Sequence, residues 1–279
     1  MADDKGLIFL HMPKAGGLTL QSIIDRQYPR RVIYKLYGPQ SMIDKFIKLP
    51  EQSRSQIRVL QGHVPFGLHK QMTVPVNYIT MLRDPVERVI SLYYWILETR
   101  ADPLYQIVKG MSLSNFADSG FAIASNYQTR LISGLMNDSG EALEAAKYNL
   151  GVPDTIFGLT ERFDESLILF KNHLGWKSVI YAKRNVTRSR PNRQEVAEEV
   201  IRKIENHNGL DIELYKFAKL RFEEIISKQG PSLPREVRKL QRLSQIYGKF
   251  SEGLNTVRRA LPPQVRTPLR KGLRIFRDH

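Results

Sequence analysis

Short β-rich segments alternate with longer helical segments along most of this chain, and this alternation limits the fold more than any other feature. We predict strands at residues 6–11, 57–62, 76–82, 155–160 and 177–182. We predict helices at residues 17–27, 40–48, 85–99, 125–134, 161–173, 192–206 and 211–228. Strands that alternate with helices are typical of βαβ units. We therefore expect an α/β fold with a central parallel sheet flanked by helices, and a 42% hydrophobic content is enough for its core.

The end of the chain differs from the rest in charge. Residues 231–279 hold 12 Lys and Arg against 3 Asp and Glu, which is +9 of the formal net charge of +15. Pro231 and Pro234 mark the boundary. We therefore divide the chain into a body, residues 1–230, and a basic, helical C-terminal extension, residues 231–279.

The extension has the pattern of an amphipathic helix. Its apolar seam consists of Leu240, Leu243, Tyr247, Phe250, Leu254, Val257 and Leu261. Pro262 and Pro263 end this helix, and a second basic amphipathic stretch covers residues 266–277. Two interpretations stay open: a terminal helix packed on the body, or a surface at residues 235–277 for an anionic membrane, an acidic polymer or a partner subunit.

Composition also restricts the compartment. The chain has no Cys, which excludes disulfides and thiolate metal sites. The apolar run at residues 6–11 is too short for a signal peptide, and no run approaches the roughly 20 residues that a membrane span needs. We predict a soluble, cytoplasmic protein that binds at most peripherally to a membrane.

A glycine-rich turn follows the first predicted strand. It reads Lys14-Ala15-Gly16-Gly17-Leu18-Thr19 and leads into a predicted helix. Such a turn lets backbone N–H groups converge on an anion, and the helix N-terminus adds a favourable dipole. The turn is not a Walker loop, because Lys14 precedes the glycines instead of following them. The pattern indicates a phosphate site, although a turn without phosphate chemistry also fits it.

A second candidate anion site follows the third predicted strand. Arg83 ends the strand, and Asp84 and Pro85 open a helix that carries Ser91. An Arg at the carboxyl end of a parallel strand can point into the crevice where open α/β sheets bind ligands, and a guanidinium suits phosphate oxygens. The alternative is that Arg83 pairs with Asp84 or Glu87 and that Ser91 lines the helix interior.

His63 directly follows the strand predicted at residues 57–62. A His at this edge would face the same crevice, and an unperturbed imidazole titrates near neutrality, as a general base should. A single His is also commonly structural. We assign His11 to the interior of its strand.

These motifs, in this order, resemble the carbohydrate sulfotransferases of the type that includes heparan sulfate 2-O-sulfotransferase and its bacterial relatives. The matching segments are residues 11–17, 62–64, 83–88 with Ser91, 126–130, 158–163 and 210–222. The resemblance spans residues 6–228 and identifies residues 1–230 as a sulfotransferase domain. It implies a P-loop NTPase-like fold that takes 3′-phosphoadenosine 5′-phosphosulfate (PAPS) as donor and moves its sulfuryl group onto a hydroxyl.

The resemblance also implies residue roles. The turn at residues 14–19 would hold the 5′-phosphosulfate, with Lys14 neutralising the bridging oxygen. Arg83 and Ser91 would hold the 3′-phosphate, and His63 would take the proton of the acceptor hydroxyl. The segment at residues 183–191 looks like a loop that closes over the nucleotide, and its candidate ligands are Thr187, Ser189 and Arg190. We expect no metal, because the sequence offers no spaced set of His, Asp and Glu ligands.

Some positions depart from the family pattern. Ala15 and Leu18 stand where relatives commonly carry Thr, and Gln61 stands where heparan 2-O-sulfotransferases carry a second His. The acceptor is therefore open: a carbohydrate, a glycolipid or a small metabolite fits. The first motif begins close to Met1, as in a bacterial soluble form.

Two other classes of function compete with this interpretation. A nucleotide-dependent small-molecule kinase could use the same fold, but Lys14 precedes the glycines and no acidic strand end suits Mg²⁺. A non-catalytic protein could bind a membrane or nucleic acid through the basic extension. We regard nucleic acid as the less suitable partner and leave an oligomer open.

Overall fold

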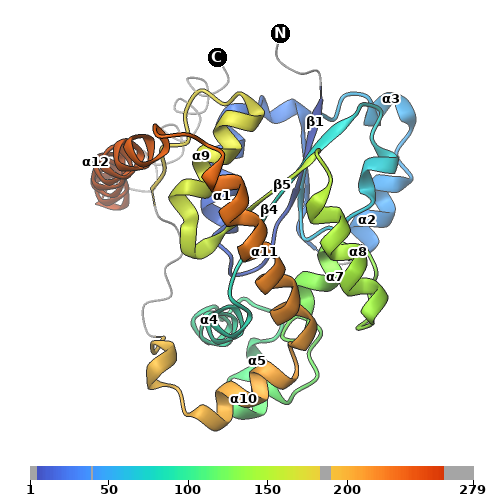
Figure 1. Cartoon of the computed structure of the whole chain (residues 1–279), viewed down its shortest axis with the longest axis vertical. Helices are drawn as coiled ribbons and strands as arrows, with labels where there is room; N and C mark the ends of the chain where they lie inside the picture. Colours follow the sequence, from blue (N-terminus) through green and yellow to red (C-terminus); the bar gives the residue numbers. More distant parts are fainter. Residues whose placement is uncertain (1–4, 39, 183–189, 261–279) are drawn as a thin grey trace.

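Among the residues that the structure describes, five parallel strands form one central sheet (Figure 1). The computed structural model describes residues 5–38, 40–182 and 190–260. The strands are β1 (Gly6–Leu10), β2 (Ile33–Leu36), β3 (Val59–Gly62), β4 (Val76–Leu82) and β5 (Thr155–Leu159). Their order across the sheet is β2-β3-β1-β4-β5, and each neighbouring pair is parallel. The expected α/β fold with a central parallel sheet is confirmed.

The edge strand β2 was not predicted from the sequence. This strand has four residues and exposes Lys35, so it lacks the continuous apolar run that marks the buried strands. It pairs with β3 alone, and Leu36 stands opposite Gly62. Gly62 is required there because a Cβ would lie 2.0 Å from the Leu36 carbonyl oxygen.

The strand predicted at residues 177–182 is wrong. Side chains bind the backbone groups that a neighbouring strand would need. Gln27 donates to one carbonyl of this segment at 2.8 Å, Arg26 donates to another, and Ser244 Oγ accepts from one of its N–H groups at 3.2 Å. The segment therefore remains irregular and packs at the edge of the main core.

The helices largely follow the predicted ranges. They are α1 (Gly17–Gln27), α2 (Gln40–Ile47), α3 (Glu51–Arg54), α4 (Pro85–Glu98), α5 (Tyr105–Val108), α6 (Leu113–Ala117), α7 (Tyr127–Ser133), α8 (Gly140–Gly151), α9 (Phe163–Leu174), α10 (Glu198–Asn206), α11 (Gly209–Ser227) and α12 (Leu233–Ala260). The helix predicted at 192–206 is split: Arg193–Glu195 form a 3₁₀ turn, and extended backbone at Val196 separates it from α10. Helices α3, α5, α6 and α8 were not predicted, because the first three are too short to show a period and α8 begins and ends with Gly.

The sheet has helices on both faces. Leu7 and Phe9 of β1 pack in the core that contains α1 and α9, whereas Ile8 and Leu10 pack with α2 on the other face. Beyond the carboxyl end of β4, helices α4, α5, α6 and α10 form a separate apolar cluster. Figure 1 shows α4, α5 and α10 together at the bottom of the view.

Helix α12 packs against α9, and Leu240 is buried in the main core. The predicted apolar seam does not stay packed along the helix, because the Phe250 side chain is 64% exposed. The predicted second basic stretch, residues 266–277, lies outside the described residues. The division of the chain at residue 231 stays a prediction. Within the described part of the chain, no helix combines the length and apolarity needed to cross a bilayer.

A fully buried ion pair joins α4 to α11. Arg88 Nη2 lies 3.9 Å from Asp211 Oδ2, and both side chains are 0% exposed. Asp211 also accepts hydrogen bonds from Gln128 N at 3.1 Å and Thr129 N at 2.7 Å, which are amides in the first turn of α7. Asp211 therefore stabilises the Arg88 charge and fixes the start of α7 beside β4.

We expect Asp211→Ala to lower the free energy of unfolding by about 3–5 kcal/mol, because it leaves the buried Arg88 guanidinium uncompensated. Urea denaturation measures the change. Glu213→Ala on the same helix is the control, since Glu213 makes an exposed pair with Lys216 that contributes about 0–1 kcal/mol. Equal effects of the two substitutions would contradict the role given to Asp211.

Candidate active site

Three aromatic side chains line up at the carboxyl edge of the sheet. Tyr37, His63 and His11 directly follow β2, β3 and β1, and the register of these strands places them next to one another. The ring centroids of His11 and His63 are 5.0 Å apart, and those of Tyr37 and His63 are 5.3 Å apart. His63 therefore stands at the sheet edge, as predicted. His11 lies beyond its strand and beside His63, so its assignment to a strand interior is wrong.

Burial determines the protonation of the two imidazoles. Burial lowers the pKa of His63 below its ordinary value, so the ring is neutral at neutral pH. Burial, and then the charge of His63, lower the pKa of His11 to about 3. His11 Nδ1 lies 3.0 Å from the Tyr37 hydroxyl, which fixes the orientation of its ring. A neutral His63 is able to accept a proton.

The turn between β1 and α1 requires both of its glycines. Gly16 has φ +77°, and a Cβ on it would lie 2.8 Å from the Phe163 ring. A Cβ on Gly17 would lie 2.0 Å from the His11 ring. Lys14 also has positive φ, at 67°. The turn therefore packs directly on His11, and the first amides of α1, which have no acceptor within the helix, lie at the same edge of the sheet.

Arg83 lies against this turn. It directly follows β4, and its Nη1 donates to the Lys14 carbonyl at 2.8 Å. Its Nη2 also lies 3.3 Å from Glu87 Oε2, so the alternative pairing with Glu87 is present as well. Arg190 Nη2 contacts the same carboxylate oxygen at 2.7 Å. Glu87 thus holds the Arg83 and Arg190 guanidiniums together beside the Lys14 turn.

One face of α4 is turned toward the Lys14 turn. Lys14 Nζ lies 5.1 Å from the centre of the Trp95 ring, and Glu87, two helical turns earlier, contacts Arg83. Ser91 lies one turn after Glu87 and one turn before Trp95, so it shares this face. Ser91 is buried in this position.

Lys14 lies in a positively charged environment. The pKa of Lys14 is lowered to about 8, chiefly by burial and then by the charges of Arg83 and Arg190, while the Glu98 carboxylate acts in the opposite direction. Because the ammonium is poorly solvated and close to two guanidiniums, an anion bound here would be strongly stabilised.

The structure brings most of the predicted residues together. Connected segments at one edge of the sheet contain seven of them: Lys14, Gly16, Gly17, His63, Arg83, Ser91 and Arg190. Ala15 and Thr19 are buried, whereas Leu18 is 39% exposed. Thr187 and Ser189 lie outside the described residues. The sequence analysis did not identify Tyr37, Trp95 or Glu98 at this edge.

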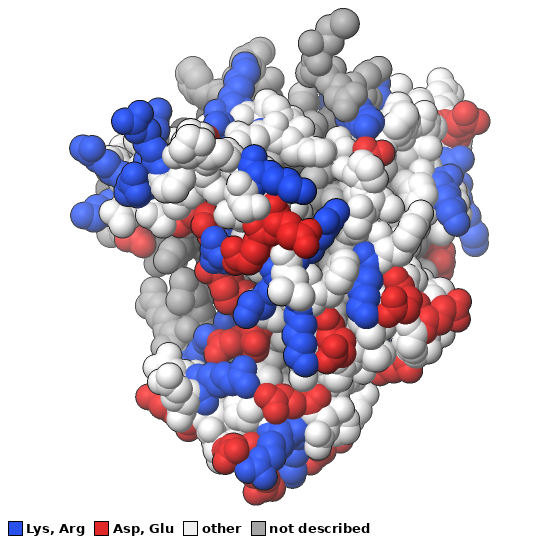
Figure 2. All heavy atoms as spheres, in the orientation of Figure 1, with Lys and Arg blue, Asp and Glu red and all other residues white. Residues whose placement is uncertain are grey.

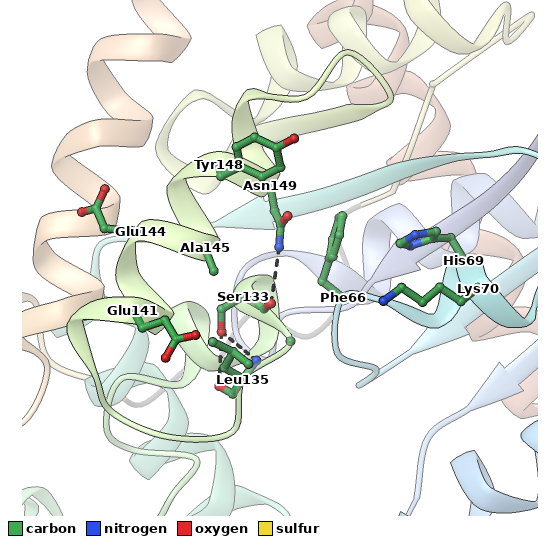
Figure 3. A pocket seen from close by; sticks show the side chains of 12 residues that line it. Phe66, His69, Lys70, Ser133, Leu135, Glu141, Glu144, Ala145, Tyr148 and Asn149 are labelled. Carbon is green, nitrogen blue, oxygen red and sulfur yellow. Dashed lines mark hydrogen bonds between the residues drawn. The ribbon is translucent and has the colours of Figure 1, made fainter.

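A cavity of about 590 Å³ lies beside this edge, between α8 and the segment that follows His63 (Figure 3). Phe66, His69 and Lys70 line one side, and Tyr148 and Glu141 line the other. None of the predicted site residues lines this cavity. Phe66 N donates to the Leu131 carbonyl of α7 at 2.9 Å, which ties the segment after His63 to α7.

The described residues contain no group of three or more His, Cys, Asp and Glu that could hold a metal ion.

Comparison with known proteins assigns the chain to a family. The family model for galactose-3-O-sulfotransferases matches residues 7–251. The chain therefore belongs to this family of carbohydrate sulfotransferases.

Two curated relatives illustrate the range of the match. Heparan-sulfate 6-O-sulfotransferase 1 of Cricetulus griseus is 30% identical over 201 residues, which are 60% of this chain and 49% of that protein. Galactose-3-O-sulfotransferase 3 of Mus musculus is 24% identical over 275 residues, which are 88% of this chain and 62% of that protein. The chain thus spans about half the length of its heparan-sulfate relative. A solved structure of mouse sulfotransferase SULT7A1 with PAP aligns with a TM-score of 0.36 and 14% identity, over 74% of this chain and 63% of that one.

We expect the Lys14 ammonium of the free protein to titrate with a pKa of about 8, as followed by NMR of labelled lysine side chains. Below this pH the site carries the Lys14 charge, and above it the charge is lost. Arg83→Gln should raise the pKa of Lys14, because it removes a nearby positive charge. Arg221→Gln, on the exposed side of α11, should not change it. A titration that does not respond to Arg83→Gln would show that the two cations do not share a site.

Proposed function

We propose that the chain is a sulfotransferase that moves the sulfuryl group of PAPS onto a hydroxyl of a carbohydrate-like acceptor. The observation that carries the proposal is the hydrogen bond from Arg83 Nη1 to the Lys14 carbonyl, at 2.8 Å. It joins the Arg83 guanidinium, at the end of β4, to the backbone of the turn that follows β1 and carries the Lys14 ammonium, so that two cationic residues meet at one edge of the sheet. This arrangement suits a nucleotide with two separate anionic groups, and family membership supports the same reaction class.

In this proposal the Lys14 turn holds the 5′-phosphosulfate. The amides at the start of α1 donate to its oxygens, and the Lys14 ammonium neutralises charge on the bridging oxygen as the sulfur–oxygen bond breaks. The Lys14 ammonium lies over the Trp95 ring, in a cation–π contact that holds the side chain in place. PAPS supplies the activated sulfuryl group, and the chain's own residues provide position and charge.

Arg83 and Ser91 hold the 3′-phosphate in this proposal. In the free protein the Arg83 guanidinium contacts Glu87, and so does Arg190. A phosphate that binds Arg83 competes with this carboxylate, so Glu87 keeps the guanidiniums in position until the donor arrives. Thr187 and Ser189 stay predictions as further nucleotide ligands.

His63 is the proposed general base. Its pKa is lowered by burial, so the ring is neutral and able to accept the proton of the acceptor hydroxyl. As the acceptor oxygen bonds to sulfur, the bond from sulfur to the bridging phosphate oxygen breaks and PAP leaves. The contact of His11 with Tyr37, and of His11 with His63, fixes the His63 ring from one side.

The acceptor is proposed at the level of its class. Matched relatives are named for galactose 3-O-sulfation and heparan-sulfate 6-O-sulfation. The expected likeness to bacterial relatives, and to the heparan 2-O-sulfotransferase type, stays a prediction. Gln61, the position where that type carries a second His, donates from Nε2 to Asp25 at 2.9 Å and is completely buried, so it supports the sheet edge from within.

We expect Arg83→Ala to weaken the binding of PAP by about 10- to 100-fold, because one charge-assisted contact to the 3′-phosphate contributes about 1.5–3 kcal/mol. Adenosine 5′-phosphate should lose less affinity, since it lacks that phosphate. Isothermal titration measures both. The control is Arg221→Ala, whose guanidinium pairs with the exposed Glu224.

The protein without the Arg83→Ala substitution should also bind PAP more tightly than ATP. If ATP binds more tightly, or if Arg83→Ala weakens both adenosine ligands equally, the assignment of the 3′-phosphate is wrong and a kinase becomes the better interpretation.

We expect His63→Ala to reduce sulfate transfer by about 100- to 10,000-fold while leaving PAP affinity unchanged, as removal of a general base does. The assay follows labelled sulfate from PAPS to galactose-terminated and glucosamine-containing oligosaccharides. His207→Ala is the matched control, because His207 is exposed and contacts Asp118. If the His63→Ala variant transfers sulfate at an unreduced rate, His63 is not the general base.

A further inference from the structure

Helix α12 turns a row of cations toward solvent. We call this row, together with the two large apolar side chains in it, the basic stripe. It consists of Arg235, Arg238, Lys239, Arg242, Ile246, Lys249 and Phe250, all exposed. Their spacings of three and four residues place them on one face of the helix. Figure 2 shows the Lys and Arg side chains of this region gathered at the left of the molecule, at the position of α12 in Figure 1.

Contacts on the opposite face fix the direction in which the stripe points. Leu233 and Leu240 are buried in the main core. Ser244 Oγ accepts from the N–H of Tyr181 at 3.2 Å, and Gln241 Nε2 donates to Asp164 of α9 at 2.9 Å. The helix is therefore anchored to the body, and its basic stripe faces outward as a consequence of the fold.

The two acidic residues in the described part of α12 lie outside the stripe. Glu236 is half-buried toward the body, and its Oε2 lies 3.8 Å from Lys171 of α9. Glu252 is separated from Lys249 by three positions and lies on the flank of the helix. The stripe therefore carries five cations and is bordered at its end by one exposed carboxylate, Glu252. Its excess of positive charge is complementary to an anionic partner.

Two large apolar side chains stand among these cations. Ile246 is 58% exposed and Phe250 is 64% exposed. They are four residues apart on the helix, so the two side chains lie next to each other among the cations. An anionic bilayer accommodates both kinds of group, because its headgroups neutralise the cations and its interfacial acyl region accepts the apolar side chains.

We propose that the basic stripe docks the chain on the surface of an anionic lipid bilayer. A second copy of the chain is a poor occupant, since two stripes would place cations against cations. A nucleic acid would neutralise the cations but would leave Ile246 in water. The stripe lies on α12, whereas the Lys14 turn and Arg83 follow β1 and β4, so the docking proposal uses none of the residues of the proposed sulfotransferase site.

Sedimentation of the full chain with vesicles tests the proposal. One set of vesicles is phosphatidylcholine, and the other contains added phosphatidylserine. We expect binding to the phosphatidylserine vesicles alone and weaker binding at higher salt. Retention of the chain in the supernatant with both kinds of vesicle would overturn the proposal, as would tighter binding to a single-stranded RNA oligonucleotide than to the phosphatidylserine vesicles.

Two sets of variants assign the binding to the stripe. The triple variant Arg238→Gln, Arg242→Gln and Lys249→Gln should bind phosphatidylserine vesicles on the order of 100-fold more weakly. Each cation near an anionic surface raises the affinity about fivefold. The double variant Ile246→Ser and Phe250→Ser should bind these vesicles on the order of 10-fold more weakly.

The matched controls lie on α11. Lys219→Gln with Arg221→Gln controls for charge, and Leu220→Ser controls for an exposed apolar side chain, because Leu220 is 71% exposed. Both should bind vesicles as the unaltered chain does. All variants should keep their helical circular dichroism and their PAP affinity. If the stripe variants bind as tightly as the α11 controls, α12 is not the docking surface, whatever the outcome of the PAP measurements.

Discussion

The parallel register of β1 with β3 and β4 is the constraint on which the rest of the site depends. In a parallel sheet all carboxyl ends meet at one edge, so the residue that follows each strand arrives at the same place. His11, His63 and Arg83 each occupy that position, and the register sets His11 beside His63. Packing of the Lys14 turn on His11 and its hydrogen bond from Arg83 then bring the fourth group to the same edge.

Two of the cations at this edge share the Glu87 carboxylate. Glu87 holds the Arg83 and Arg190 guanidiniums, while Lys14 is kept over the Trp95 ring with a lowered pKa. Cations that are desolvated and close together are costly in the free protein, and they gain most from an incoming anion. His63 lies apart from these contacts, where burial keeps it neutral. The site thus separates groups suited to hold a donor from a group suited to accept a proton.

Much of this could be predicted from the sequence, because apolar runs and strand-end residues carry strong local signals. Four of the five strands and the residues Lys14, Arg83 and His63 followed from those signals. Tyr37 could not be found, because β2 is a short edge strand without a continuous apolar run. Trp95 looked like an ordinary helix residue, since its role depends on where α4 lies relative to the Lys14 turn. Glu87 was expected only as an alternative partner of Arg83, and its second contact, with Arg190, depends on the fold. The segment at 177–182 has the composition of a strand, but side chains distant in sequence bind its backbone.

The most direct measurement of the central claim is a crystal structure of the chain with PAP bound. We expect the 5′-phosphate at the start of α1 beside Lys14, the 3′-phosphate on Arg83 and Ser91, and His63 facing the open side of the 5′-phosphate. A nucleotide that binds elsewhere, or with its 3′-phosphate directed into solvent away from Arg83, would contradict it.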